Sequence, residues 1–343
     1  MVRSPFILIA SCLLVPGACA PLPQLPFSVD ADLSPPRIVT MDLDRQGALV
    51  LGFDEPCELL HDAVVAGDTL RNHVITTSWT GEQTNLVIGF DPLPEMGREH
   101  FVEAQVADGN GNSLRFVARF YGPNQLLPAM VINEFTTQGS GKHPDFVEIR
   151  VLTAGNLAGA CLIEGIPGDW QSRFIFPDLG VEAGDYVVVH FKPQGLSTEV
   201  NETSDKTASL GYDASPTAWD FWVDSGDGLS ANNGALLLCE SPLGGAIDAV
   251  LYSNRTRESD DRYRGFGSPS VLGYADFLGE SGAWRGEEPL VPDDAINPED
   301  STATRSMCRS ATSADTNTRL DWHIVPTRGL SPGLPNTDAT YEG

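Results

Sequence analysis

Two short segments near the middle of the chain carry acidic side chains of the kind that act as general acids and bases. Asn133-Glu134 follows an apolar run, and Asp145 and Glu148 stand three residues apart in a second run. A carboxylate pair can hydrolyse a glycosidic bond only when both groups face one substrate. In an alternating strand Asp145 and Glu148 point to opposite faces, so they cannot form such a pair. We interpret Asn133 and Glu134 as a hydrogen-bonding corner at a strand end and assign no catalytic residue.

The six histidines are isolated from one another in the sequence. No two of them have the i, i+2 or i, i+4 spacing with which a strand or a helix presents metal ligands. The chain also lacks the G-x-S-x-G sequence of a serine nucleophile and any phosphate-binding loop. These absences predict no enzyme activity, no bound metal and no cofactor. The histidines are His61, His73, His100, His143, His190 and His323.

Residues 192–229 mix aromatic and acidic side chains and are the best candidate for ligand contact. Exposed aromatic rings stack on sugars or peptides, and the D-x-x-D-G sequence that starts at Asp224 offers oxygens of the type that calcium binds. The alternative, which we favour, is an extra strand at 219–223 whose aromatics cover the fold, because D-x-x-D-G lacks the alternating spacing of an EF-hand loop. The candidate contacts to a protein or glycan ligand are Tyr212, Trp219, Phe221, Trp222, Asp224 and Asp227.

The first 19 residues have the pattern of a bacterial export signal. Arg3 precedes an apolar run that ends near Val15, and Pro16 interrupts it, so the segment is too short to span a bilayer permanently. Small residues then precede Cys19, as in a relaxed bacterial lipobox. We expect a lipid on Cys19 that anchors the exported protein to the cell membrane, or to the outer membrane and cell surface.

Two other ways of processing the N-terminus stay open. Ala18-Cys19-Ala20 also satisfies the cleavage rule of a plainly secreted protein, and Ile9-Ala10-Ser11-Cys12 is a second lipobox-like sequence. Residues 20–36 follow with five prolines, which fix the backbone and remove hydrogen-bond donors. This segment predicts an extended tether between an anchor and a folded domain.

The balance of charge argues against nucleic acid as a partner. The chain has 47 acidic and 21 basic side chains, a net charge of −26. Binding to nucleic acid requires clustered Lys and Arg that displace phosphate counterions, and no basic patch occurs here. The acidity is typical of a protein that stays soluble outside the cell.

Length and composition predict two β domains. The 343 residues exceed one ordinary sandwich, and 34 glycines and 25 prolines favour strands and turns over helices. Short alternating segments recur in the first domain, and Asp108-Gly109-Asn110-Gly111-Asn112 is a strong hairpin signal. The predicted organisation is an export signal at 1–19, a tether at 20–36, a first module at 37–122, a second module at 127–336 with insertions at 192–229 and 254–300, and a C-terminal tail at 337–343.

Three motifs in the first module carry a family resemblance. They are Leu51-Gly52-Phe53-Asp54-Glu55-Pro56, the turn Phe90-Asp91-Pro92-Leu93-Pro94 before Gly97-Arg98-Glu99-His100-Phe101, and the stretch from Asp108 to Leu114. In this order they resemble the bacterial Ig-like domain of surface-layer and cell-wall proteins. That resemblance implies a β-sandwich used for spacing or presentation.

Seven phrases in the second module carry another resemblance. They include Ile132-Asn133-Glu134-Phe135, Asp145-Phe146-Val147-Glu148-Ile149, Ile247-Asp248-Ala249-Val250, Asp321-Trp322 and Pro332-Gly333-Leu334-Pro335-Asn336. Together they resemble the lamin-tail domain, an Ig-type β-sandwich, over residues 127–336. The resemblance implies a binding or positioning module and names no ligand. We expect Asp321-Trp322 to combine a turn-forming acid with an aromatic side chain that closes the core.

Four cysteines follow Cys19, and their pairing stays open. An even number of cysteines in an exported chain allows three disulfide connectivities, but a cysteine in an apolar strand also serves as a small buried hydrophobe. They are Cys57, Cys161, Cys239 and Cys308.

The predicted function is that of a non-catalytic, surface-displayed structural or interaction protein. The alternative is an accessory or catalytic component of an extracellular hydrolase of the nuclease or phosphoesterase type, because bacterial lamin-tail domains often accompany such enzymes. The alternative requires a catalytic domain, and the two modules leave no segment for one.

Overall fold

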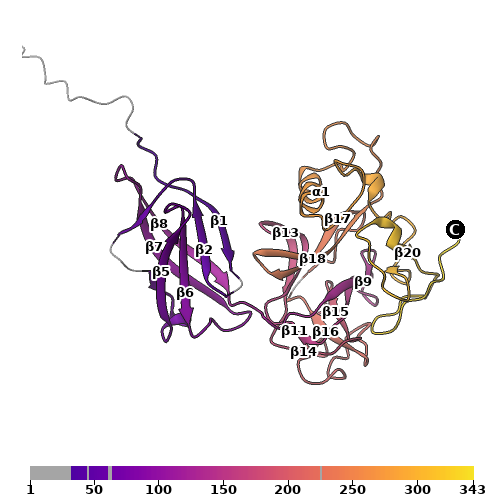
Figure 1. Ribbon diagram of the computed structural model, residues 1–343. Coiled ribbons are helices and arrows are strands. Elements are labelled where there is room, and N and C mark those ends of the chain that lie inside the picture. Colours follow the sequence, from indigo (N-terminus) through magenta and orange to yellow (C-terminus); the bar gives the residue numbers. More distant parts are fainter. Residues whose placement is uncertain (1–31, 45, 61–63, 225) are drawn as a thin grey trace, which may run out of the picture.

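The computed structural model describes residues 32–44, 46–60, 64–224 and 226–343, in which strands make up most of the regular structure (Figure 1). The predicted all-β class is therefore confirmed. Within these ranges no helix has the length and apolar character needed to cross a membrane. Cys19, the export signal and residues 20–31 of the predicted tether lie outside the described residues.

The strands of the first module form two antiparallel sheets. One has the order β1-β2-β6-β5; in the other, β7 is paired with β3, β4 and β8. The elements are β1 (Ile38–Leu43), β2 (Leu49–Phe53), β3 (Glu58–Leu59), β4 (Val65–Ala66), the short 3-10 helix η2 (Asp68–Leu70), β5 (Val74–Thr80), β6 (Asn85–Asp91), β7 (Glu99–Ala107) and β8 (Ser113–Tyr121).

Alternating side chains explain why the two sheets of the first module pack face to face. In β8, Ala118 and Phe120 are buried while Arg115 and Arg119 are exposed, because successive residues of a strand point to opposite faces. The buried residues of β2 and β6 meet those of β7 and β8 in one apolar cluster. The predicted hairpin joins β7 to β8, where the side chain of Asp108 accepts hydrogen bonds from the backbone of the turn.

The second module has a larger sheet of six strands in the order β16-β15-β10-β9-β19-β20 and a sheet of four in the order β13-β12-β17-β18. Its elements are β9 (Met130–Thr136), β10 (Phe146–Val151), β11 (Gly155–Asn156), β12 (Cys161–Ile166), β13 (Asp169–Ile175), β14 (Gly180–Val181), β15 (Tyr186–His190), β16 (Ala218–Trp222), β17 (Asn233–Ser241), β18 (Gly244–Ser253), α1 (Pro269–Ser281), η3 (Pro292–Asp294), β19 (Met307–Arg309), η4 (Arg319–Asp321) and β20 (Trp322–Ile324).

One continuous apolar core fills the space between these two sheets. Ile132, Val147 and Val189 of the six-stranded sheet pack with Leu236 and Val250 of the four-stranded sheet, and all five are fully or almost fully buried. Burial of such side chains, at roughly 1.5–3 kcal/mol each, is the main term that holds a sandwich together. This core is separate from the apolar cluster of the first module.

Helix α1 lies within the 254–300 insertion, a segment for which the sequence analysis assigned no structure. Ser268 caps its first turn by accepting a hydrogen bond from the backbone of Val271, and Gly282 ends it at a φ of 71°. Its buried residues, Val271, Tyr274, Ala275 and Leu278, have helical spacing and join the core of the second module.

The junction between the modules contains two side-chain hydrogen bonds and one close backbone contact. The side-chain amide of Asn124 donates to the carbonyl oxygens of Asn156 (2.8 Å) and Ala158 (2.9 Å). Gly97 lies directly against Gly159, since a Cβ atom built on either glycine would come within 2.5 Å of the other's backbone. The two modules therefore contact each other directly at Gly97 and Gly159, and the linker is bonded to the second module through Asn124.

Candidate functional site

Two acidic side chains lie together in the interior of the second module. Glu148 of β10 is directly opposite Glu134 of β9, and both are fully buried. A β-bulge at Asn133 allows two consecutive residues, Asn133 and Glu134, to contribute side chains to the same buried polar layer. Burial raises the pKa of Glu134, and burial together with the negative charge of Glu134 raises the pKa of Glu148 well above its usual range.

The C-terminal segment supplies the partners of these acids. The hydroxyls of Ser306 and Ser331 and the backbone N–H of Ser331 donate to Glu134. The backbone N–H of Gly333 donates to Glu148 at 2.6 Å. The side chain of Asn133 donates to Glu148 at 2.7 Å, so every acid in the layer has fixed donors.

Asn336 adds a further contact between the C-terminal segment and β9. Its amide donates to the backbone carbonyl of Asn133 and accepts from the Asn133 side chain, both at 3.1 Å. The contacts agree with a hydrogen-bonding role for Asn133 and Glu134, but the predicted position at a strand end is wrong, because both residues lie in the middle of β9 beside a bulge. Their polar groups attach residues 331–336 to the six-stranded sheet.

A second buried polar cluster surrounds Arg309 on β19. Its guanidinium contacts both carboxylate oxygens of Asp248 at 3.1 and 3.2 Å and donates to the backbone carbonyl of Ile132 at 2.7 Å. It also stacks over the ring of Trp322, 4.7 Å from the ring centroid, and forms an ion pair with Asp321. Burial outweighs the favourable charge of Arg309 and raises the pKa of Asp248 to about 6. As predicted, Trp322 packs on the core and Asp321 accepts backbone hydrogen bonds in a turn.

The aromatic residues of the 192–229 insertion contribute mainly to packing. β16 pairs in parallel with β15, so the added strand that we favoured is present. Phe221 is fully buried in the core, and Trp222, 4% exposed, stacks on His190 with ring centroids 4.0 Å apart. The ligand-contact prediction is therefore wrong for Phe221 and Trp222, because neither ring is accessible to an external sugar or peptide.

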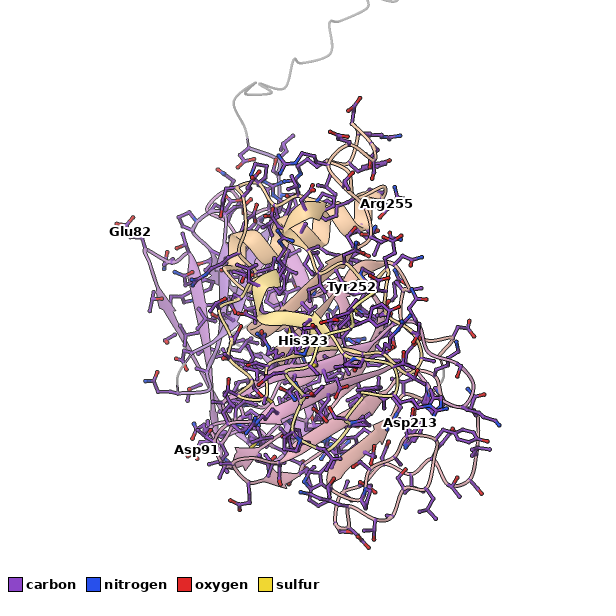
Figure 2. The ribbon with its side chains drawn as sticks, turned by 90° about the vertical axis from the view of Figure 1, so that its right-hand side faces the viewer. Glu82, Asp91, Asp213, Tyr252, Arg255 and His323 are labelled. Carbon is purple, nitrogen blue, oxygen red and sulfur yellow. The ribbon has the colours of Figure 1, made fainter. Side chains whose placement is uncertain are left out.

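The other candidate contacts lie nearer the surface, but they do not form one site. Trp219 is half-buried, with the amine of Lys206 over its ring, whereas Tyr212 is 41% exposed. Asp224 and Asp227 are exposed and do not join any group of three potential metal ligands in the described part of the chain. Figure 2 shows Asp213, the neighbour of Tyr212, in the outer loops, away from Tyr252 and His323.

His190 and Asp220 form a buried pair that the sequence analysis did not anticipate. The His190 Nε2 atom lies 2.6 Å from a carboxylate oxygen of Asp220, and both side chains are inaccessible to solvent. The second oxygen of Asp220 accepts from the backbone N–H of Ser215 at 2.7 Å. The pair joins β15 to β16 and has no access to a substrate.

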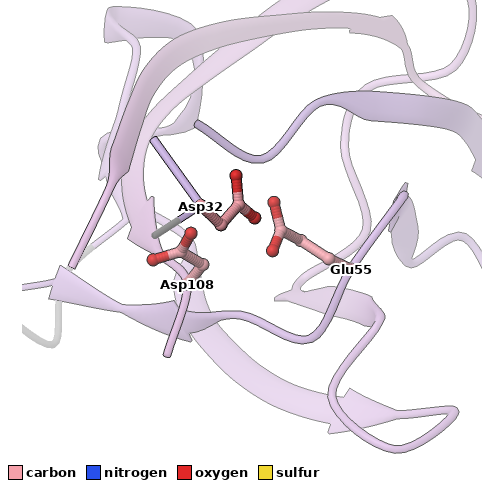
Figure 3. Close-up of side chains that lie close together, drawn as sticks. All are labelled: Asp32, Glu55 and Asp108. Carbon is pink, nitrogen blue, oxygen red and sulfur yellow. The ribbon is translucent and has the colours of Figure 1, made fainter. Parts of the chain in front are cut away.

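Three carboxylates gather where the predicted tether meets the first module, as Figure 3 shows: Asp32 of the tether with Glu55 and Asp108 of the module. One oxygen from each lies within 4.8 Å of the others. Hard oxygen ligands of this kind suit calcium. The side chain of Asn112 and nearby backbone N–H groups already donate to Asp108 and lower its pKa. Burial and the negative charges of Asp108, Asp32 and Asp54 raise the pKa of Glu55. An acidic cluster of this kind also forms without a metal, so the trio alone does not establish a metal site.

The four cysteines within the described residues are free and buried. Cys161 and Cys239 are register partners on β12 and β17, and burial raises the pKa of the Cys161 thiol to about 12. In this environment both thiols act as small apolar side chains of the core.

A cleft of about 740 Å³ lies at the junction of the modules. Strand β1 forms one wall and the β17–β18 hairpin the other, and the linker around Asn124 forms the floor. Its volume falls within the range of roughly 300–1,000 Å³ that is typical of ligand pockets. This cleft is not predictable from the sequence, because it depends on how strands from the two modules come together.

A family model and one curated relative match part of this chain. Residues 128–324 match the family model described as "TP_1001_2nd: protein second domain". An uncharacterized protein of Treponema pallidum (strain Nichols) is 29% identical over 168 residues, which cover 49% of this chain and 42% of that protein, so the match spans less than half of the relative. No solved structure matches. Because the family model covers more than half of the residues, this chain belongs to the TP_1001_2nd family.

Proposed function

We propose that this protein is an exported, lipid-anchored and non-catalytic interaction protein that presents two β-sandwich modules at the cell surface. The first module would act as a bacterial Ig-like spacer, and the second as a lamin-tail-type binding or positioning domain. A protein or glycan would be its partner outside the cell.

The observation that carries this proposal is that the clustered acid–base groups of the second module are buried, where no substrate can reach them. The carboxylates of Glu134, Glu148 and Asp248 are enclosed and bonded to fixed partners, as is the His190–Asp220 pair. The inter-module cleft is accessible, and its described lining residues include the carboxylates of Asp42, Asp44 and Glu240 but no His, Cys, Lys or Arg. Accessible surface of this kind is suited to binding.

The lamin-tail interpretation is supported by the role of its motif residues. Asn133, Glu134, Glu148, Gly333 and Asn336 come from three separate phrases of the resemblance, and all five meet in one buried layer. Their common role is to attach the C-terminal segment to the sheet. A motif whose residues complete the fold is compatible with a domain that binds rather than catalyses.

To test this function, the full chain is expressed in a bacterial host, and its N-terminal residue and its cellular location are determined. We expect mass spectrometry to find a diacylated Cys19 as the first residue, and added protease to digest the protein on intact cells. Cys19→Ser should move the protein from the membrane to the soluble fraction, whereas the control Cys12→Ser should leave it on the membrane.

Two results would contradict this proposal. An unprocessed N-terminus inside the cell would rule out export. A mature chain that begins near Pro21 would rule out the lipid anchor but would leave export in place. The hydrolase alternative makes a different prediction, because it requires the mature protein to cleave DNA, RNA or a phosphodiester with magnesium or calcium present. Cleavage that survives purification and is lost in Glu148→Gln would replace the non-catalytic proposal.

A further inference from the structure

We propose that the inter-module cleft binds an extended, basic peptide segment that lies along the free edge of β1. This inference rests on the proposed function, since it names the site and the partner class of the interaction protein. A peptide would bind by adding a strand to the sheet edge, with its backbone supplying hydrogen bonds and its side chains supplying specificity.

Strand β1 is an edge strand of its sheet, with a bulge between Ile38 and Thr40 and a hydrogen bond from the Leu43 N–H to its neighbour Asp42. It pairs on one side with β2, and no other described strand pairs with it. Val39 is 59% exposed and Met41 39% exposed, so apolar side chains lie beside the free backbone groups. Protein sheets usually cover or charge such edges because they attract additional strands. Figure 1 shows β1 on the side of the first module nearest the second.

The opposite wall of the cleft is also a sheet edge. β18 ends the four-stranded sheet, and the segment at Ile296 covers only its second half, through hydrogen bonds with Leu251 and Ser253. The uncovered half begins with Gly244, Gly245 and Ala246, and this part lines the cleft. Such small side chains let another backbone approach closely.

Charge determines which peptide fits. Asp42, Asp44 and Glu240 line the cleft, and none of its described lining residues is basic. Asp42 and Glu240 are exposed and form no ion pair among the described residues. Lys or Arg side chains that alternate along a bound strand would meet these carboxylates, whereas an acidic strand would be repelled.

The floor of the cleft is fixed before any ligand arrives. The amide of Asn124 joins the linker to two carbonyl oxygens of the second module, and the Gly97–Gly159 contact sets the spacing of the walls. A preformed cleft spares a ligand the entropy cost of ordering its walls.

The test measures fluorescence anisotropy of a labelled peptide, Lys-Val-Lys-Val-Lys-Val-Lys, with the mature protein. We expect saturable binding that weakens about tenfold in the double variant Asp42→Asn/Glu240→Gln, as for the loss of two exposed ion pairs. Glu58→Gln/Glu280→Gln is the matched control, because it removes the same net charge at exposed positions outside the cleft. It should change the affinity less than about twofold.

Two comparison peptides separate strand addition from simple charge attraction. The Glu-Val counterpart should not bind, and a Lys-Val peptide with alternate backbone nitrogens methylated should bind about tenfold more weakly or worse, because methylation removes the donors that pair with an edge. Equal affinity of the methylated peptide, equal loss in the two double variants, or no binding would overturn the proposal. A dimer that buries β1 would assign the edge to a second copy and overturn it as well.

The peptide-binding proposal can be wrong while the proposed function is correct. A partner that still binds the Asp42→Asn/Glu240→Gln variant would leave an interaction protein with a different binding site. Hydrolytic activity of the purified protein would instead overturn the proposed function, whatever the peptide does.

Discussion

Replacing Arg309 with alanine is expected to destabilise the second module by about 3–5 kcal/mol, the usual cost of removing one partner from a buried ion pair. The substitution leaves the carboxylate of Asp248 buried without its counter-charge and removes the donor to the Ile132 carbonyl. It also removes the guanidinium that stacks on Trp322. For a domain of this size the melting temperature should fall by about 10 °C.

Chemical and thermal unfolding of the mature protein, followed by tryptophan fluorescence, measures this loss. Five of the six tryptophans lie in residues 127–336, so the signal reports mainly on the second module. Arg319→Ala is the matched control, because Arg319 is exposed on η4. It should change the stability by less than about 0.5 kcal/mol. An Arg309→Ala variant as stable as Arg319→Ala would mean that the buried cluster contributes little to the fold.

Replacing Glu148 with alanine is expected to cost about 2–4 kcal/mol. Each buried donor left without an acceptor costs about 1–3 kcal/mol, and this change leaves two, the side-chain amide of Asn133 and the backbone N–H of Gly333. Since Gly333 belongs to the segment that closes the sheet, residues 331–336 should also exchange their amide hydrogens faster. Glu182→Ala, at an exposed position before β15, is the control and should change neither property.

The same variant should change how stability depends on pH. The pKa of Glu148 is raised from its ordinary 4.5, so the folded state holds this proton more tightly than the unfolded chain. Its contribution is fully present below about pH 4.5 and is lost as the pH rises through the raised pKa. Burial raises the pKa of Asp145 and Glu164 as well, so their contributions have the same sign.

Unfolding free energies at pH 5 and pH 8 provide the measurement. The mature protein should lose stability between these values, and Glu148→Ala should lose less over the same interval because one titrating group is gone. A variant whose pH dependence equals that of the unchanged protein would show that Glu148 does not titrate in this range with a raised pKa.

The parts of the fold that could be predicted from sequence depend on local patterns. The turn around Asp108 is coded by adjacent Gly and Asn residues, and the alternation in β8 shows which face is buried. Helix α1 was also readable, because Ser268-Pro269 begins it, Gly282 ends it, and its apolar residues have helical spacing. The signal for this helix is therefore present in the sequence, although no structure was predicted for residues 254–300.

The interior polar contacts could not be predicted because they join residues far apart in the chain. Glu134 and Glu148 become opposite only through the register of β9 with β10, and a bulge shifts that register. Arg309 stands 61 residues from Asp248, and nothing near either residue indicates the other. Trp222 is in an acidic, aromatic segment that suits a surface as well as a core, and its parallel pairing with β15 decides between them.

Glu134 and Glu148 are buried and hold the C-terminal segment on the six-stranded sheet, whereas Asp42 and Glu240 are exposed in the inter-module cleft. Carbodiimide labelling of the mature protein with glycine ethyl ester, read by peptide mass spectrometry, measures which of these carboxylates are accessible. We predict that Asp42 and Glu240 are modified in the folded protein, whereas Glu134 and Glu148 are modified only after denaturation. Labelling of Glu134 or Glu148 in the folded protein at the rate of Asp42 would contradict the claim, because it would place those carboxylates within reach of a substrate.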